Sequence, residues 1–281
     1  MFYLLNILIQ MKILLNNKTL IRKIRPFNDI GFIPTMGGIH KGHISLIQRS
    51  KRVCKKTIVS IFVNPKQFNN KKDFKTYPVN IKKDLSILKK IKGIDFVYIP
   101  KFQDIYDTKK KSKIKINIKD KILCAKFRNG HFEGVLDVMD RLTNLIKPKK
   151  IFMGKKDFQQ LFLVKNFIEK KHKTKVIGCK TIRDKNKFAL SSRNYLFNKD
   201  DLNVAGNISK MFFLVKKMLK KNKNIDKLLF ETKKNMQKKF EIKIEYMELR
   251  NKKNLFLSKK IKDSKLFVAY YLKNVRLIDN F

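Results

Sequence analysis

The chain has 281 residues, which is enough for one large and one small domain. Its formal net charge of +46 would normally suggest nucleic acid or an anionic membrane as a partner. However, only 10 of its 68 basic residues are Arg and its lysines are scattered along the whole sequence, whereas specific nucleic-acid sites use Arg and clustered patches. We therefore predict no specific nucleic-acid partner. We also predict no membrane span, because the apolar segment at residues 2–9 is far too short to cross a bilayer.

The cysteines are few and widely spaced. Cys54, Cys124 and Cys179 are odd in number and form no C-x-x-C pair, so neither a disulfide framework nor a zinc ribbon is indicated. This usage is typical of a reducing compartment, and we predict a cytoplasmic protein. Met11 is an alternative start to Met1, which would make residues 1–10 an appendage.

Strands and helices alternate through the first two thirds of the sequence. The predicted elements, in chain order, are a strand at 30–33, a helix at 44–53, a strand at 57–63, a helix at 80–92, a strand at 94–99, a helix at 134–146, a strand at 150–154, a helix at 158–171 and a strand at 175–182. Such alternation is typical of βαβ units, so we predict an α/β fold with a Rossmann-like, doubly wound parallel sheet.

The last hundred residues have a different pattern. Lysine-rich helices are predicted at 201–220 and 225–238, followed by short strands at 242–249 and 266–272. We therefore predict two domains. Residues 11–181 form a Rossmann-like nucleotide-binding domain, and residues 182–281 form a smaller C-terminal α+β domain.

The most informative segment is Pro-Thr-Met-Gly-Gly-Ile-His-Lys-Gly-His at residues 34–43, at the point where a predicted strand turns into a helix. Two histidines three residues apart lie on one face of the first helical turn, beside its free N–H groups, and such a turn binds phosphate. A metal half-site is an alternative, although no Cys or carboxylate cluster stands beside His40 and His43. Two surface histidines without a role are another.

Three further segments follow predicted strands and should meet the histidines at the same sheet edge. Asn64 and Gln67 supply amide groups able to hold a carboxylate or a hydroxyl. Lys156 stands at a helix start and is a candidate phosphate ligand, whereas Asp157 beside it is either part of the site or only a helix cap. Residues 190–194 contribute two hydroxyls and an Arg, or form a solvated turn.

Taken together, these segments make the chain resemble the pantothenate synthetase (pantoate–β-alanine ligase) family of the nucleotidyltransferase superfamily, which carries a His-x-Gly-His signature. The matching motifs are PTMGGIHKGH at 34–43, SIFVNPKQF at 60–68, YP at 77–78, GHFEGV at 130–135, GKKDFQQL at 154–161, ALSSRN at 189–194 and RLIDN at 276–280.

The resemblance implies that ATP and magnesium, pantoate and β-alanine bind to this chain. The implied ATP site comprises Met36, Gly37, Gly38, Ile39, His40, Lys41, Gly42, His43, Gly154, Lys155, Lys156, Asp157, Ile182, Leu190, Ser191, Ser192 and Arg193. Gln67 and Gln160 would hold pantoate, with Gln67 also next to β-alanine, and no residue is implied as a metal ligand. The implied catalytic residues are His43, as an acid or charge-stabilising imidazole, His40, Lys156 and Arg193.

The implied reaction is attack of pantoate on the α-phosphorus of ATP, which gives pantoyl adenylate and pyrophosphate, followed by displacement of AMP by β-alanine. The C-terminal domain would act as a lid that excludes water from the labile adenylate. The family is typically homodimeric. Three positions depart from its usual pattern: Lys155 replaces Glu, Val79 replaces Arg, and Tyr195 follows a loop shortened by one residue.

Two other functions remain open. One is a different transferase of the same superfamily, such as a cytidylyltransferase or a tRNA-charging enzyme, against which the Gln67 and Gln160 pair and the missing anticodon-binding extension argue. The other is a basic nucleic-acid-binding protein that retains an inactive nucleotide fold, which the net charge favours and which predicts salt-sensitive polyanion binding without adenylate formation.

Overall fold

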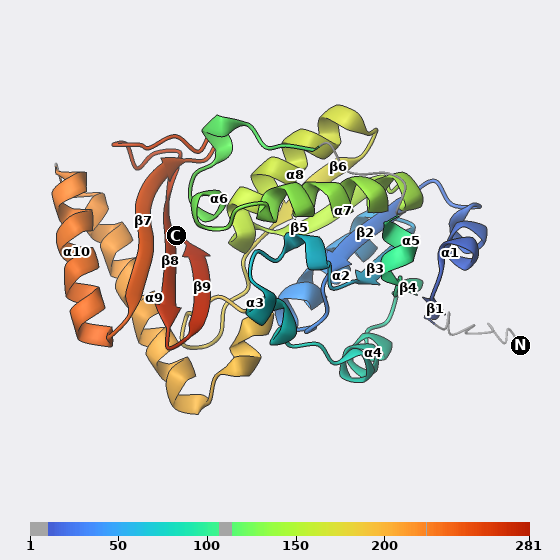
Figure 1. The fold of residues 1–281 in the computed structure, drawn as a ribbon, viewed down its shortest axis with the longest axis horizontal. Helices are drawn as coiled ribbons and strands as arrows, with labels where there is room; N and C mark the ends of the chain where they lie inside the picture. Colours follow the sequence, from blue (N-terminus) through green and yellow to red (C-terminus); the bar gives the residue numbers. More distant parts are fainter. Residues whose placement is uncertain (1–10, 107–113, 223) are drawn as a thin grey trace, which may run out of the picture.

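The computed structural model describes residues 11–106, 114–222 and 224–281, and these form two sheets with helices packed on them (Figure 1). The larger sheet has six parallel strands in the order β1-β4-β3-β2-β5-β6. Its strands are β1 (Lys12–Leu14), β2 (Ile30–Thr35), β3 (Lys56–Ile61), β4 (Phe96–Tyr98), β5 (Lys150–Gly154) and β6 (Lys175–Cys179).

Helices cover both faces of this sheet. Those of this part of the chain are α1 (Asn17–Ile24), α2 (Lys41–Val53), α3 (Lys71–Lys75), α4 (Ile81–Lys89), α5 (Phe102–Ile105), α6 (Cys124–Phe127), α7 (His131–Ile146) and α8 (Phe158–Lys171). Neighbouring strand residues point to opposite faces, so Phe32 packs in the same core as α1, α7 and α8 whereas Ile33 packs with α2 and α4. This is the doubly wound parallel sheet that the sequence predicted.

The smaller sheet is antiparallel and consists of β7 (Lys243–Asn251), β8 (Ser264–Leu272) and β9 (Val275–Asn280). Helices α9 (Lys199–Leu219) and α10 (Ile225–Phe240) cover the face that is turned away from the larger sheet (Figure 1). Tyr246 and Phe267 belong instead to the core that α7 and α8 form on the larger sheet. The two sheets therefore share a packed boundary.

Strand β5 and helix α8 begin and end at the predicted residues. Helix α2 begins at Lys41, three residues before the predicted start, because His40 caps it. Strand β6 ends at Cys179 rather than at residue 182. Strand β9 was not predicted, because Asp279 and Asn280 are buried polar residues that interrupt the apolar pattern of a strand.

No helix in the described part of the chain is long and apolar enough to cross a membrane. The apolar segment at residues 2–9 and the choice between Met1 and Met11 as the start concern residues 1–10, which lie outside the described residues.

Candidate active site

A cavity of about 840 Å³ lies at the carboxyl edge of the larger sheet and reaches β9 and the turn before it. Strands β2 and β5 are neighbours in that sheet, and the chain continues outward from β2 to β3 on one side and from β5 to β6 on the other. Ligands of open α/β sheets bind at such a switch point. The loop after β2 carries His40 and the turn after β5 carries Lys156, so both reach the cavity.

The loop after β2 is held by a carboxylate that the sequence did not indicate. Asp84 of α4, which is 2% exposed, accepts hydrogen bonds from the backbone N–H groups of Gly38 at 2.9 Å and Ile39 at 2.7 Å. Gly37 and Gly38 have φ values of +84° and +62°, and a Cβ on Gly38 would lie 2.6 Å from that of Ser192. The loop is therefore fixed between α4 and the segment around Ser192.

The expectation that free N–H groups of this turn hold phosphate needs correction. Besides the two groups bound by Asp84, the N–H of Gly42 donates to Nδ1 of His40 at 3.0 Å and that of His40 donates to Nδ1 of His43 at 3.4 Å. These N–H groups already have partners within the protein. The four N–H groups of Gly38, Ile39, His40 and Gly42 are therefore not free in this structure.

Both histidines line the cavity, and their rings lie close together. Their ring centroids are 4.2 Å apart. Burial, followed by the neighbouring Lys156 charge, lowers the pKa of His40 to about 4. Burial, followed by the charges of His40 and Lys156, lowers the pKa of His43 to about 3. Since each Nδ1 accepts a backbone hydrogen bond, both neutral rings carry their proton on Nε2.

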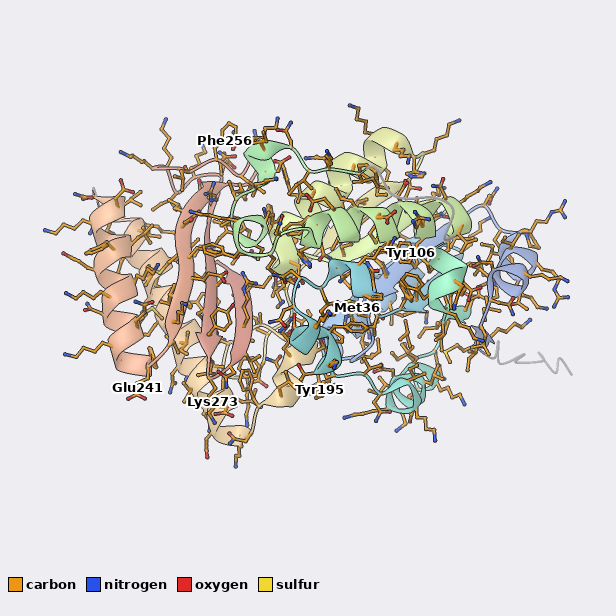
Figure 2. The ribbon with its side chains drawn as sticks, in the orientation of Figure 1. Met36, Tyr106, Tyr195, Glu241, Phe256 and Lys273 are labelled. Atoms are coloured by element: carbon orange, nitrogen blue, oxygen red, sulfur yellow. The ribbon has the colours of Figure 1, made fainter. Side chains whose placement is uncertain are left out.

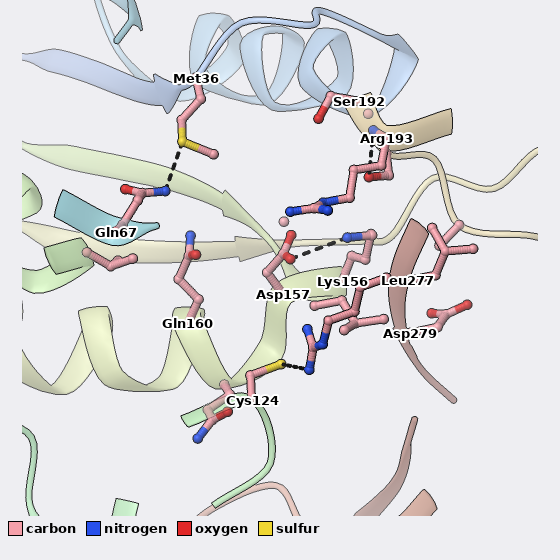
Figure 3. Close-up of a pocket in the computed structure, with 18 of the residues that line it drawn as sticks. Met36, Gln67, Cys124, Lys156, Asp157, Gln160, Ser192, Arg193, Leu277 and Asp279 are labelled. Carbon is pink, nitrogen blue, oxygen red and sulfur yellow. Dashed lines mark hydrogen bonds and ion pairs between the residues drawn. The ribbon is translucent and has the colours of Figure 1, made fainter. Parts of the chain in front are cut away.

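Lys156 and Asp157 form the end of a 3-10 turn, η3 (Lys155–Asp157), between β5 and α8. The ammonium of Lys156 lies 3.3 Å from Oδ1 of Asp157 and is largely covered. Asp157 occupies the N-cap position of α8, yet its side chain makes no capping hydrogen bond. Its carboxylate lines the cavity instead, as Figure 3 shows.

The two glutamines lie on the same side of the cavity (Figure 3). Gln67 follows β3 in the 3-10 turn η1 (Pro65–Gln67), and its Nε2 donates to Sδ of Met36 at 2.8 Å. Asn64 is 1% exposed and donates to Oε1 of Gln67 at 3.2 Å and to the carbonyl of Gly134 at 3.1 Å. Asn64 therefore orients Gln67. Because the NH₂ group of Asn64 already donates to these two partners, it is not available to a substrate, contrary to what the sequence suggested.

The segment that carries Arg193 closes the cavity from the other side. It forms the 3-10 turn η4 (Ser192–Leu196), in which Ser192 shares a hydrogen bond of 3.0 Å with Tyr77 and the hydroxyl of Tyr195 donates to the carbonyl of Ile39 at 3.0 Å. In Figure 2, Met36 and Tyr195 both lie at the junction of the two sheets. Arg193 itself is paired with Asp73 of α3 at 2.8 Å.

Most of the residues that the family resemblance implied are brought together. The cavity wall includes Met36, His40, Gly42, His43, Gln67, Gly154, Lys156, Asp157, Gln160, Ile182, Leu190, Ser191, Ser192 and Arg193. The wall does not include Gly37, Gly38, Ile39, Lys41 or Lys155. Ile39 is 1% exposed and packs in the core beneath α2, and Lys155 is exposed outside the cavity.

The sequence interpretation missed several polar residues at the cavity. Arg128 and His131 lie at the wall, 2.9 Å apart, and His131 Nδ1 is 2.6 Å from the carbonyl of Gln67. Burial and then the Arg128 charge lower the pKa of His131 to about 3. The motif GHFEGV contained His131, but neither composition nor spacing revealed that α7 would bring it beneath Gln67.

The fold and this cavity together define an α/β enzyme that binds a nucleotide at the carboxyl edge of a parallel sheet. Comparison with known proteins identifies the family. The sequence profile of the pantoate-beta-alanine ligase family matches residues 10–281, so the chain belongs to that family and is a ligase.

Relatives of similar length support this assignment. The pantothenate synthetase of Cytophaga hutchinsonii is 35% identical over 261 residues, which cover 91% of this chain and 92% of the relative. That of Clostridium botulinum strain Loch Maree is 38% identical over 268 residues, covering 94% and 95%.

Solved structures of the family have the same fold. The pantoate-beta-alanine ligase of Thermus thermophilus matches with a TM-score of 0.89 at 26% identity, covering 96% of this chain and 99% of that one. The Francisella tularensis enzyme, solved as a complex with beta-gamma ATP and beta-alanine, matches with a TM-score of 0.80 at 34% identity, covering 96% and 97%.

Proposed function

We propose that the chain condenses pantoate with β-alanine in two steps at this cavity. In the first step a carboxylate oxygen of pantoate attacks the α-phosphorus of ATP, and the bond to the bridging oxygen of pyrophosphate breaks. In the second step the amine of β-alanine attacks the acyl carbon of pantoyl adenylate, loses a proton and expels AMP. The observation that carries this proposal is that Gln67 and Gln160 share one cavity with His40, His43 and Lys156.

The proposed role of the two histidines is hydrogen-bond donation. Because their pKa values are about 4 and about 3, both rings are neutral near pH 7 and donate from Nε2 to phosphate oxygens without transferring a proton. A role of His43 as a general acid is therefore not favoured. Lys156 and Arg193 supply the positive charge that offsets repulsion between the two anions.

Gln67 and Gln160 are proposed to hold pantoate, with Gln67 also beside β-alanine. Gln67 is 8% exposed and is held by Asn64 and Met36, so its amide is oriented before a substrate arrives. Preorganised amides lower the entropic cost of aligning a carboxylate with the α-phosphorus.

Magnesium is proposed to arrive with the phosphates of ATP. Within the described residues no group of three or more His, Cys, Asp and Glu side chains could hold a metal ion. Mg²⁺ typically uses one or two carboxylates together with substrate phosphates and water, and Asp157 at the cavity wall fits that pattern because its carboxylate is 44% exposed. The ion would neutralise phosphate charge.

We further propose two domains, residues 11–181 and 182–281, with the second acting as a lid. One hydrophobic core is formed only by residues from 188 onward, which supports a separate folding unit. We also propose a homodimer in the cytoplasm. The family resemblance supports the dimer, and the three free thiols, Cys54, Cys124 and Cys179, are consistent with a reducing compartment. Sedimentation velocity would distinguish the 33.4 kDa monomer from its dimer.

The reaction can be tested by measuring pyrophosphate and AMP from ATP and magnesium, with pantoate and β-alanine added singly and together. Pantoate alone should give about one pyrophosphate per active site, whereas sustained AMP release should require both substrates. Gln67→Ala and Gln160→Ala should raise the KM for pantoate, whereas Gln48→Ala on the exposed side of α2 should not. Turnover with a different acid would indicate another transferase, and polyanion binding without turnover would indicate the nucleic-acid-binding alternative.

A further inference from the structure

The last strand of the chain contacts the turn that carries Lys156. Nδ2 of Asn280, in β9, donates to the backbone carbonyls of Lys155 at 2.9 Å and Lys156 at 2.8 Å. These partners are 125 and 124 residues apart in the sequence, and Asn280 is 3% exposed. Asn280 belongs to the RLIDN motif, for which neither the sequence nor the proposed reaction gave a role.

The orientation of this amide is fixed by its neighbours. The ammonium of Lys265, in β8, donates to Oδ1 of Asn280 at 2.6 Å. Because an ammonium group only donates, the oxygen of Asn280 must face Lys265 and its NH₂ group must face the two carbonyls. The backbone N–H of Asn280 also donates to Asp279 at 2.7 Å.

Asp279 connects the same strand end to the segment that follows β6. Arg183 binds both carboxylate oxygens of Asp279, at 2.6 Å and 2.8 Å, and its guanidinium also lies 3.3 Å from the carbonyl of Asn280. Paired planar groups of this kind restrict orientation as well as separation. Asn280 is therefore held from three directions, by Lys265, by Asp279 and by Arg183.

The residues at the two ends of the turn that Asn280 contacts supply no capping side-chain hydrogen bond. Gly154 precedes it without a side chain, and Asp157 makes no capping hydrogen bond to α8. A rigid donor on the two carbonyls therefore limits how far the backbone of Lys156 can move, and with it the ammonium at the cavity wall.

We propose that Asn280 is a positioning residue for Lys156, through which the small sheet sets the place of a cation in the ATP site. The proposal depends on the role of Lys156 that the proposed function assigns. Asn280 acts through the backbone of the turn and touches no substrate. We therefore expect the loss of Asn280 to lower the reaction rate only when Lys156 is present.

The test is a double-mutant cycle of Asn280→Ala and Lys156→Met, with pyrophosphate formation from ATP and pantoate as the readout. A displacement of about 1 Å can cost up to about 10²-fold in rate, so we expect Asn280→Ala to lose about 10- to 100-fold when Lys156 is present. In the Lys156→Met background the same change should cost less than about 2-fold. An equal loss in both backgrounds, or no loss in either, would overturn the proposal.

Val268→Ala is the matched control for a purely structural effect. Val268 is fully buried in β8 and does not line the cavity, so its truncation should lower the Tm while leaving the rate per folded molecule unchanged. If Asn280→Ala does not fold, Asn280→Asp replaces the NH₂ group by an oxygen that faces two carbonyls, and the same cycle applies.

ATP affinity in the same variants separates this proposal from the proposed reaction. Failure of the reaction would appear as a wild-type chain that binds ATP but forms no pyrophosphate with pantoate. In that case the Kd for ATP replaces the rate as the quantity measured in the four chains of the double-mutant cycle. Asn280→Ala should weaken binding about 10-fold only when Lys156 is present, which is the fold-change expected for a displaced charged contact. Equal weakening with and without Lys156 would contradict the proposal.

Discussion

The backbone N–H of His40 donates a hydrogen bond to Nδ1 of His43, across 3.4 Å. His40 accepts a similar hydrogen bond, because the backbone N–H of Gly42 donates to its Nδ1 at 3.0 Å. A ring nitrogen that accepts a hydrogen bond carries no proton, so the turn selects one tautomer for each histidine. Burial strengthens this selection, because it disfavours the charged ring.

Stability should therefore fall as the pH drops below about 6.5. The folded-state pKa values of His40, His43 and His131 are about 4, about 3 and about 3, against 6.5 when unfolded. Above 6.5 both states are neutral at these rings. Below pH 6.5 these rings become protonated in the unfolded chain only. Each ring then lowers the free energy of unfolding by at most about 1.4 kcal/mol per pH unit, until the pH reaches its folded-state pKa.

Urea unfolding at about pH 7 and about pH 5 would measure this dependence. His131→Gln removes one of the three histidines whose pKa is lowered by folding. The free energy of unfolding of this variant should therefore fall less steeply than that of the wild type over the same pH range. Equal stability of the wild-type chain at the two pH values would contradict the burial of neutral rings.

His43→Ala should lose about 10² to 10³ in the rate of pyrophosphate formation, which is the size found when one transition-state donor is removed. The effect is expected on kcat for adenylate formation because phosphate charge is redistributed in that step. Gln48→Ala on the exposed face of the same helix provides the control. An unchanged rate in His43→Ala would exclude the assigned role.

Asp84→Asn should raise the KM for ATP. The carboxylate accepts from both Gly38 and Ile39, and an amide would place an NH₂ group against one of those N–H groups. Leaving one buried group unsatisfied costs about 1–3 kcal/mol, so we expect a rise of about 10-fold and a lower Tm. The KM for pantoate should change little, because Gln67 is held by Asn64.

Asp226→Asn is the matched control for charge alone, since the side chain of Asp226 is 79% exposed and does not line the active-site cavity. Kinetics of Asp84→Asn equal to those of Asp226→Asn would show that Asp84 does not fix the loop.

How far the sequence predicts this molecule depends on whether a feature is local. Strand β5 and helix α8 were predicted to the residue because each has a local apolar pattern. The position of His40 and His43 at a strand-to-helix turn was likewise local. The partners Asp84 and Asn280 were not found, because each acts on a backbone group distant in the sequence and no spacing rule encodes such a contact.

The motif GHFEGV illustrates the same limit. A Cβ on Gly134 would lie 2.2 Å from the carbonyl oxygen of Lys66, so only glycine lets α7 pack against the turn that carries Gln67. Gly134→Ala should therefore cost about 1–3 kcal/mol of stability and raise the KM for pantoate as Gln67 moves.

Gly154→Ala is the control for Gly134→Ala, because nothing lies within 4 Å of a Cβ built there. Its Tm should not fall and should rise by at most about 3 °C, since Ala at a φ of −75° typically stabilises by about 0.4–1 kcal/mol through the unfolded chain. Thermal unfolding of both variants checks the difference. Equal melting temperatures for the two would contradict the close approach of α7 to Lys66.

The family resemblance leads us to expect Glu in place of Lys155, and we predict that Lys155→Glu changes kcat and the KM for ATP by at most about 2- to 3-fold. The side chain of Lys155 is exposed, outside the cavity wall, and only its backbone carbonyl contacts Asn280. An exposed charge is screened by salt over about 8–10 Å.

Lys156→Glu reverses a charge at the cavity wall itself. It should lower kcat at least about 10²-fold, the size expected when a charge-stabilising contact is removed. Steady-state kinetics of the two variants at low and high salt would separate these effects. A tenfold or larger change in Lys155→Glu would mean that this side chain enters the site when ATP binds.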